Sequence, residues 1–215
     1  MILRLPSSRF LVDLIYPPSC LNCNAPVENP VHFCEECLEH FTLLPLEGRC
    51  TKCFASIPTP IGTCLPCRKL RHPFRKVGAC FDPEGPALKL ASHFLEGGYR
   101  PVAKEIASYM VVQLSTLPFP EFDLITTVPS FFQQPLAPIG KELACLLGCP
   151  YKPLLRRLLD PKPKFRLKKG CVIINQKVLL IEMSFKQGDS FRAAGWALDK
   201  GRPENIYGMT FCASF

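Results

Sequence analysis

The sequence lacks a hydrophobic run long enough to cross a membrane, which takes about 20 consecutive apolar residues. No stretch of its 215 residues reaches that length. The first segment, Met1 to Pro18, contains two arginines, and Asp13 interrupts its apolar part. We interpret it as a short amphipathic helix rather than a secretory signal, because no small-residue cleavage site follows it. We therefore expect a cytoplasmic protein without a membrane span.

Acidic residues are fewer than basic ones, with 18 Asp and Glu against 26 Lys and Arg, so the formal net charge is +8. Metal binding would reduce this excess. Four thiolates around one zinc ion carry a charge of about −2, so two such sites would leave about +4. Any prediction of nucleic-acid binding must then rest on local clusters of cations rather than on the total charge.

Cysteine is abundant, with 13 residues. Eight of them form four Cys-x-x-Cys pairs, and ten residues separate the inner cysteines of the first two pairs and of the last two. In a chain without an export signal, this pattern is typical of a metal framework rather than of disulfides. Structural zinc takes four ligands in a tetrahedron, and thiolates suit it. The predicted ligands of two structural zinc ions are Cys20, Cys23, Cys34, Cys37, Cys50, Cys53, Cys64 and Cys67.

The simplest assignment joins the first pair with the second and the third with the fourth, but an interleaved arrangement is also open. A redox role for the pairs would need a helix N-terminus in a thioredoxin-like setting, and nothing around them resembles one. With eight cysteines present, we expect the four histidines to be surface residues rather than ligands.

From Val77 onward the sequence alternates between helical and strand-like patterns. Apolar residues at helical spacing predict helices over 86–96, from Pro101 onward, over 139–147 and over 190–200. Buried apolar runs predict strands over 123–128, 177–182 and 206–212. The sequence thus predicts two domains, a double zinc-ribbon module over 1–76 and an α/β domain with a mainly parallel sheet over 77–215.

The order of these features resembles the ComF (competence protein F) family. An apolar start, Ile15-Tyr-Pro-Pro-Ser-Cys20, precedes the paired Cys-x-x-Cys turns and an α/β half. Members of this family are related to type I phosphoribosyltransferases and are linked to DNA uptake in natural transformation. The resemblance implies a phosphoribosyltransferase-like fold for residues 77–215.

The resemblance also implies a site for phosphoribosyl pyrophosphate (PRPP) after the strand over 177–182. The family has two acidic residues there, followed by a Thr-rich, Gly-containing loop that opens a helix. Here Met183 replaces the second acid, and Asp189 adds a negative charge beside the expected phosphate. The residues that match the motif are Glu182, Lys186, Gln187, Gly188 and Ser190, with Glu182 as the catalytic candidate. If the site is catalytic, Mg²⁺ would bridge the pyrophosphate oxygens.

A second departure from the family follows Val128-Pro129, where a basic segment is shortened to Ser130-Phe-Phe-Gln-Gln. The stretch from Lys152 to Lys169 nevertheless holds eight basic residues and one acid, Asp160. Cations interleaved with an aromatic residue are typical of single-stranded DNA binding, although a solvated basic loop gives the same pattern. The candidate nucleic-acid-binding residues are Lys162, Lys164, Phe165, Arg166, Lys168 and Lys169.

Three functions follow from these features. The first is a competence-type protein that binds single-stranded DNA and acts with other DNA-uptake proteins. The second is an active phosphoribosyltransferase that uses PRPP and Mg²⁺. The third is a non-catalytic scaffold for protein partners.

Overall fold

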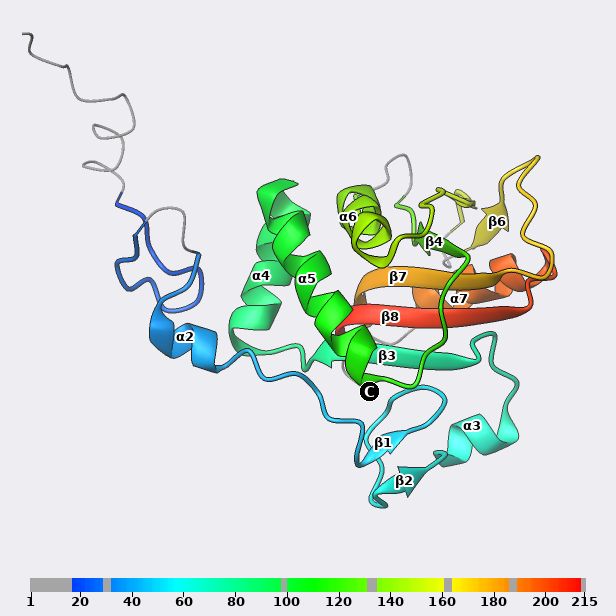
Figure 1. The fold of residues 1–215 in the computed structure, drawn as a ribbon, viewed down its shortest axis with the longest axis horizontal. Helices are drawn as coiled ribbons and strands as arrows, with labels where there is room; N and C mark the ends of the chain where they lie inside the picture. Colours follow the sequence, from blue (N-terminus) through cyan, green and yellow to red (C-terminus); the bar gives the residue numbers. More distant parts are fainter. Residues whose placement is uncertain are drawn as a thin grey trace, which may run out of the picture.

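The computed structural model describes residues 17–28, 32–97, 100–130, 135–160, 164–185 and 189–213. Two small cysteine modules precede an α/β domain (Figure 1). The first module contains helix α2 (Glu35–Glu39), and the second contains β1 (Arg49–Cys50), β2 (Ile61–Gly62) and α3 (Leu65–Lys69). Most of the segment for which we predicted an amphipathic helix lies outside the described residues. None of the helices in the described part of the chain combines the length and the apolar character that crossing a membrane requires.

The two modules repeat the same turn thirty residues apart. In both, the backbone N–H of the first cysteine donates to a carbonyl five residues later, at 2.7 Å. The residue after the second cysteine, Asn24 or Phe54, has a positive φ of 62° or 67°. Cys34 and Cys64 are the N-caps of α2 and α3. The repeated spacing in the sequence therefore encodes a repeated local structure.

The α/β domain is built on four parallel strands in the order β3-β8-β7-β4. They are β3 (Lys76–Phe81), β4 (Leu124–Thr127), β7 (Lys177–Phe185) and β8 (Asn205–Ala213). The prediction of a mainly parallel sheet is confirmed. Strands β4, β7 and β8 lie where we expected them, although β7 continues three residues beyond Glu182. We did not predict β3.

Helices cover both faces of this sheet (Figure 1). On one face, α4 (Gly85–Gly97), α5 (Arg100–Thr116) and α6 (Ala137–Leu147) share a core with the β7 residues Ile181 and Met183. On the other face, α7 (Asp189–Asp199) packs in a second core with Leu180. The two cores follow from the strand period of two, which sends neighbouring residues of β7 to opposite faces. All four helices were predicted from the sequence.

A short antiparallel hairpin, β5 (Leu155–Arg157) with β6 (Phe165–Leu167), joins the core on the α7 side. We predicted only a basic segment here. Leu155 and Phe165 are buried, whereas Arg156 and Arg166 are exposed, so the hairpin has one apolar face and one cationic face. The hairpin therefore turns part of the basic segment into an ordered surface.

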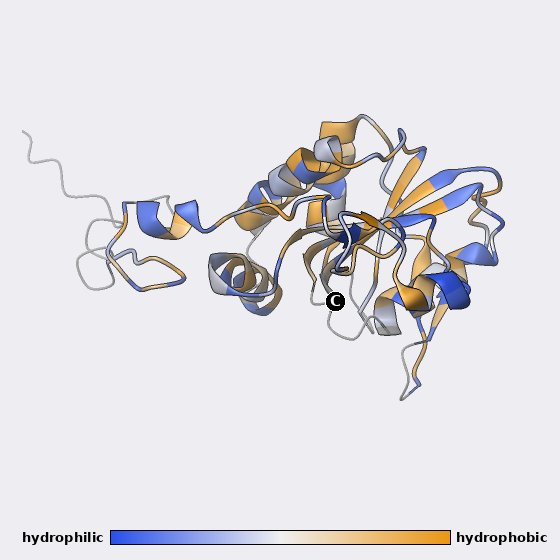
Figure 2. Cartoon of the chain, turned by 90° about the horizontal axis from the view of Figure 1, so that it is seen from below, coloured by the Kyte–Doolittle hydropathy of each residue, from blue (hydrophilic) through white to orange (hydrophobic). Residues whose placement is uncertain are grey.

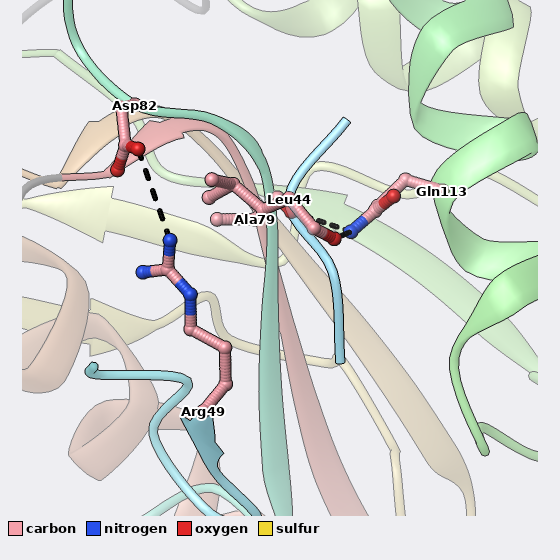
Figure 3. A network of polar contacts seen from close by, with 5 residues as sticks. All are labelled: Leu44, Arg49, Ala79, Asp82 and Gln113. Carbon is pink, nitrogen blue, oxygen red and sulfur yellow. Dashed lines mark hydrogen bonds and ion pairs between the residues drawn. The ribbon is translucent and has the colours of Figure 1, made fainter. Parts of the chain in front are cut away.

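The linker between the two modules is hydrogen-bonded along the edge of the sheet. Leu44 donates its backbone N–H to the carbonyl of Cys80 on β3, at 2.8 Å. The buried amide of Gln113, on α5, donates to the carbonyls of Leu44 and Ala79, at 2.8 and 2.9 Å (Figure 3). Because β3 is an edge strand with open backbone groups, these bonds satisfy part of that edge and fix the linker.

Further contacts attach both modules to the domain. The ring of Phe41 stacks on that of Tyr109, on α5, with centroids 5.0 Å apart. From the second module, Arg49 pairs with Asp82 at 3.8 Å (Figure 3). In Figure 2 the first module lies at one end of the molecule, and its helix α2 is mostly hydrophilic. Aromatic packing and hydrogen bonds beside the linker therefore position the modules against β3 and α5.

Candidate functional site

The first module brings four sulfur atoms together. The Sγ atoms of Cys20, Cys23, Cys34 and Cys37 all lie within 4.8 Å of one another. Those of Cys23 and Cys34 are 3.5 Å apart. A tetrahedral zinc ion with Zn–S bonds of about 2.3 Å would place its sulfurs about 3.8 Å apart. The cluster thus has the donor set and the dimensions of a structural zinc site.

The second module has the same arrangement. Its cluster consists of Cys50, Cys53, Cys64 and Cys67, again within 4.8 Å, with 3.6 Å between the sulfurs of Cys53 and Cys64. The first pair therefore joins the second and the third joins the fourth, and the interleaved alternative is wrong. Neither cluster contains a histidine. Each module could hold one metal ion.

Backbone donors favour one thiolate in each cluster. Burial raises the pKa of Cys20, but the N–H groups of Cys23, Cys34 and Asn22 outweigh it and lower that pKa to about 6. Burial likewise opposes ionisation of Cys50, yet N–H donors, first among them Cys53, lower its pKa to about 6.

One other thiol in each cluster, Cys37 or Cys67, resists ionisation in the absence of a cation. Asn22 donates to the sulfur of Cys37 at 3.3 Å and lowers its pKa, but burial and the other sulfurs raise it to about 12. Burial, helped by Cys64 and Cys50 and opposed by a hydrogen bond with Cys53, raises the pKa of Cys67 to about 12. Four thiolates this close repel one another, and a divalent cation is the group that would stabilise them together.

We predict two zinc ions per chain. The Cys50→Ser variant should retain one, because a structural site that loses one of four ligands loses most of its affinity. Metal content of the purified protein, measured by mass spectrometry, tests this. Cys145→Ser is the matched control, since Cys145 is an exposed cysteine outside both clusters. Two equivalents of zinc retained by Cys50→Ser would contradict the assignment.

A second candidate site lies where the chain changes faces of the sheet. Strands β4 and β7 are neighbours, with Thr127 opposite Ile181. The chain leaving β4 leads to α6 on one face, and the chain leaving β7 leads to α7 on the other. Parallel α/β sheets bind ligands at such a switch point, outside the carboxyl ends of the strands. The predicted PRPP motif begins at Glu182, within the last residues of β7, and therefore lies at this place.

Glu182 lies near the end of β7 on the side of α7 and the hairpin. Burial raises the pKa of Glu182 to about 7, even though the Met183 N–H, which donates to its Oε1 at 2.9 Å, and the charge of Arg157 act against the rise. Met183 is 1% exposed and packs in the opposite core with α4–α6. Met183, which stands where the ComF family has its second acid, is therefore a core residue.

The rest of the predicted PRPP motif is only partly described. Ser190 is the second residue of α7 and is half-buried. Lys186, Gln187 and Gly188 lie outside the described residues, as do residues 131–134 of the shortened segment after β4. The structure thus places Glu182 and Ser190 at the end of β7 and the start of α7.

The predicted nucleic-acid-binding residues gather on the hairpin. Phe165 and Arg166 are in β6, whereas Lys164, Lys168 and Lys169 flank it. Lys162 lies outside the described residues. Phe165 is 8% exposed and packs in the core beneath the guanidinium of Arg157, so it is not an open stacking surface. The burial of Phe165 therefore argues against the expectation that its ring stacks on a base.

Solved phosphoribosyltransferases are among the structural neighbours of the chain. An adenine phosphoribosyltransferase is 19% identical, with 58% of this chain and 75% of that chain covered and a TM-score of 0.39. The Saccharomyces cerevisiae enzyme, in complex with adenine and an imino-altritol bisphosphate, is 19% identical, with coverages of 55% and 72% and a TM-score of 0.37. Both cover little more than half of this chain. Comparison with protein-family models and with curated proteins gives no match.

Two features of the hairpin were missed at the sequence level. Arg156 and Arg166 are direct cross-strand partners, and Arg157 lies close enough to Glu182 to lower its pKa. The signal was present in Leu155-Arg-Arg and Phe165-Arg-Leu, which alternate between apolar and basic residues. Each stretch is only three residues long, too short to indicate a strand by periodicity alone.

The raised pKa of Glu182 predicts a pH-dependent stability. Because the unfolded chain releases this proton near pH 4.5 and the folded chain near 7, the burial penalty is absent at acid pH and grows as the pH rises through that window. Glu182→Gln should therefore stabilise the protein above pH 7 by on the order of 3 kcal/mol and have little effect below pH 4.5. Urea unfolding of both proteins across this range measures the difference. Glu142→Gln, at an exposed position on α6, should show no such trend, and a pH-independent difference for Glu182→Gln would contradict the prediction.

Proposed function

We propose that this chain is a ComF-type protein that binds single-stranded nucleic acid on its basic hairpin. In this proposal residues 1–76 are the zinc module and residues 77–215 are a phosphoribosyltransferase-like scaffold. The observation that carries it is the register of the hairpin, in which Arg156 lies directly opposite Arg166. The link to DNA uptake, and to other DNA-uptake proteins as partners, rests on the resemblance in chain order.

The close approach of Arg156 and Arg166 is favourable only if an anion compensates their charges. Like charges that face each other across two strands destabilise a hairpin. Among the described residues, neither Arg156 nor Arg166 has an ion-pair partner. Lys152 and Lys169 are exposed nearby in the sequence and extend the positive charge. A phosphate backbone would neutralise several of these cations at once and release counterions from the nucleic acid.

Binding should depend steeply on salt. For single strands, each phosphate contact contributes about 0.7 to the slope of log affinity against log salt. The variant Arg156→Ala/Arg166→Ala should therefore bind more weakly and lower the slope by about 1.4. Fluorescence anisotropy with a labelled oligodeoxythymidylate measures both quantities. Lys104→Ala, which removes an exposed cation from α5, is the matched control and should leave the slope unchanged. No binding at low salt would overturn the proposal.

Transfer of phosphoribose is the second candidate function. The switch point beside Glu182 and the start of α7 supports it, since anions bind well at helix N-termini. Two observations oppose it. Met183 occupies the core instead of offering a second carboxylate, and Glu182 gives up its own proton only near pH 7. A carboxyl group that is half-protonated is a poor acceptor for the ribose hydroxyls.

We therefore expect PRPP with Mg²⁺ to give no binding heat at neutral pH in isothermal titration. The protein must first be shown to be folded and zinc-loaded. A saturable heat that disappears in Glu182→Ala but persists in Glu142→Ala would favour the enzyme instead. A non-catalytic scaffold for a protein partner is the third alternative, and no described contact favours it specifically.

A further inference from the structure

A groove with a volume of 620 Å³ lies between β6 and α7, two elements that pack against each other. Its size falls within the range of about 300–1,000 Å³ that is usual for ligand sites. Aromatic, cationic and aliphatic residues line it. The aromatic and cationic ones are Trp196, Phe165, Lys164, Arg166 and Lys200. None of the described residues that line the groove is acidic.

Trp196 is the only tryptophan in the sequence, and its ring is half-buried. The guanidinium of Arg71 lies over the ring, 5.3 Å from its centroid, and pairs with Asp199 at 3.3 Å. Arg71 does not line the groove. The indole therefore contacts Arg71 and also lines the groove. Because Trp196 is half-buried on α7, a helix packed in the core, its ring loses little conformational entropy when a flat ligand stacks on it.

The charges of the groove favour an anion. Lys164 is paired with Asp160 at 2.6 Å, and Asp199 is engaged by Arg71, so the two nearby acids are already compensated. Arg166 and Lys200 have no ion-pair partner in the described part of the chain. A ligand that fits must combine negative charge with a flat ring. An acidic peptide would use the cations but leave the indole without a stacking partner.

The cations also continue beyond the groove. Arg156 lies opposite Arg166 on the hairpin, and Lys168 and Lys169 follow β6. A positive surface longer than the groove suits a ligand with repeated phosphates rather than a single nucleotide. Bases inside a duplex are covered by their neighbours, so only a single strand offers a free face to the indole.

We propose that the groove between β6 and α7 is a base-stacking subsite for single-stranded nucleic acid, with Trp196 as the stacking surface, Lys200 as a phosphate contact in the groove, and Arg166 as a phosphate contact on the adjoining cationic face of the hairpin. The proposal rests on the proposed function and deepens it, because it assigns a base contact in addition to backbone contacts. Stacking on an aromatic ring tolerates any base, so we expect affinity without strong sequence preference.

The lone tryptophan reports directly on the subsite. An oligodeoxythymidylate should quench the fluorescence of Trp196, whereas an abasic strand of equal length should bind without quenching. Loss of one base stack should weaken binding roughly 5- to 140-fold. We therefore expect Trp196→Ala to lower the affinity for the oligodeoxythymidylate by such a factor, as measured by anisotropy of a labelled strand. Its affinity for the abasic strand should stay unchanged, and Trp196→Phe should retain most of the binding.

The outcomes separate this proposal from the proposed function. If the oligodeoxythymidylate binds without quenching and Trp196→Ala binds it equally well, the subsite is wrong but hairpin binding survives. If no strand binds, both fail. Equal quenching by polyglutamate, or tighter binding of free thymidine monophosphate than of the strand, would also overturn the subsite. Two zinc equivalents retained in Trp196→Ala would show that its loss of binding does not come from a damaged second module.

Discussion

Mutual repulsion among clustered thiolates is the constraint on which the structure of the two cysteine modules depends. Four sulfurs within 4.8 Å of one another cannot all ionise without a cation between them, and this condition holds in both modules. The segments that carry them are short and contain helices of only five residues each. Such segments have too little apolar surface to form cores of their own. Metal binding and folding of the modules are therefore expected to be one process.

The segment that follows the second module packs against α7, on the face of the sheet opposite α4–α6. The chain that leaves α3 places Arg71 over Trp196 and Phe74 against Phe191, whose ring centroids are 4.5 Å apart. Trp196 and Phe191 are both on α7, the helix that forms one wall of the cationic groove. A segment of a few residues thus connects the second cysteine cluster to one wall of the groove. The second module is therefore packed against the α/β domain and is not an independent unit.

Long apolar signals in the sequence predicted the fold well, and short ones did not. Strands β4, β7 and β8 and all four large helices were predicted because each has a continuous run or a clear helical period. Strand β3 was missed because Lys76-Val-Gly-Ala-Cys-Phe81 begins with a cation and includes glycine. The spacing of the cysteines left two ways of combining the four Cys-x-x-Cys pairs into clusters. Only the structure excluded the interleaved one. The groove joins Trp196 to Arg166 across thirty residues of chain, a contact that no local pattern encodes.

The two consecutive residues at the end of β7 show how fold and chemistry separate here. Because neighbours on a strand face opposite sides, Glu182 and Met183 belong to different environments. The methionine adds apolar surface to the core beneath α4–α6, which a carboxylate there would disrupt. Glu182 instead lies near Arg157, whose guanidinium also covers Phe165 on the hairpin. The polar chemistry that remains at this end of the strand therefore faces the core side of the hairpin, where Arg157 lies, whereas Arg156 and Arg166, on which we place the nucleic acid, lie on its opposite face.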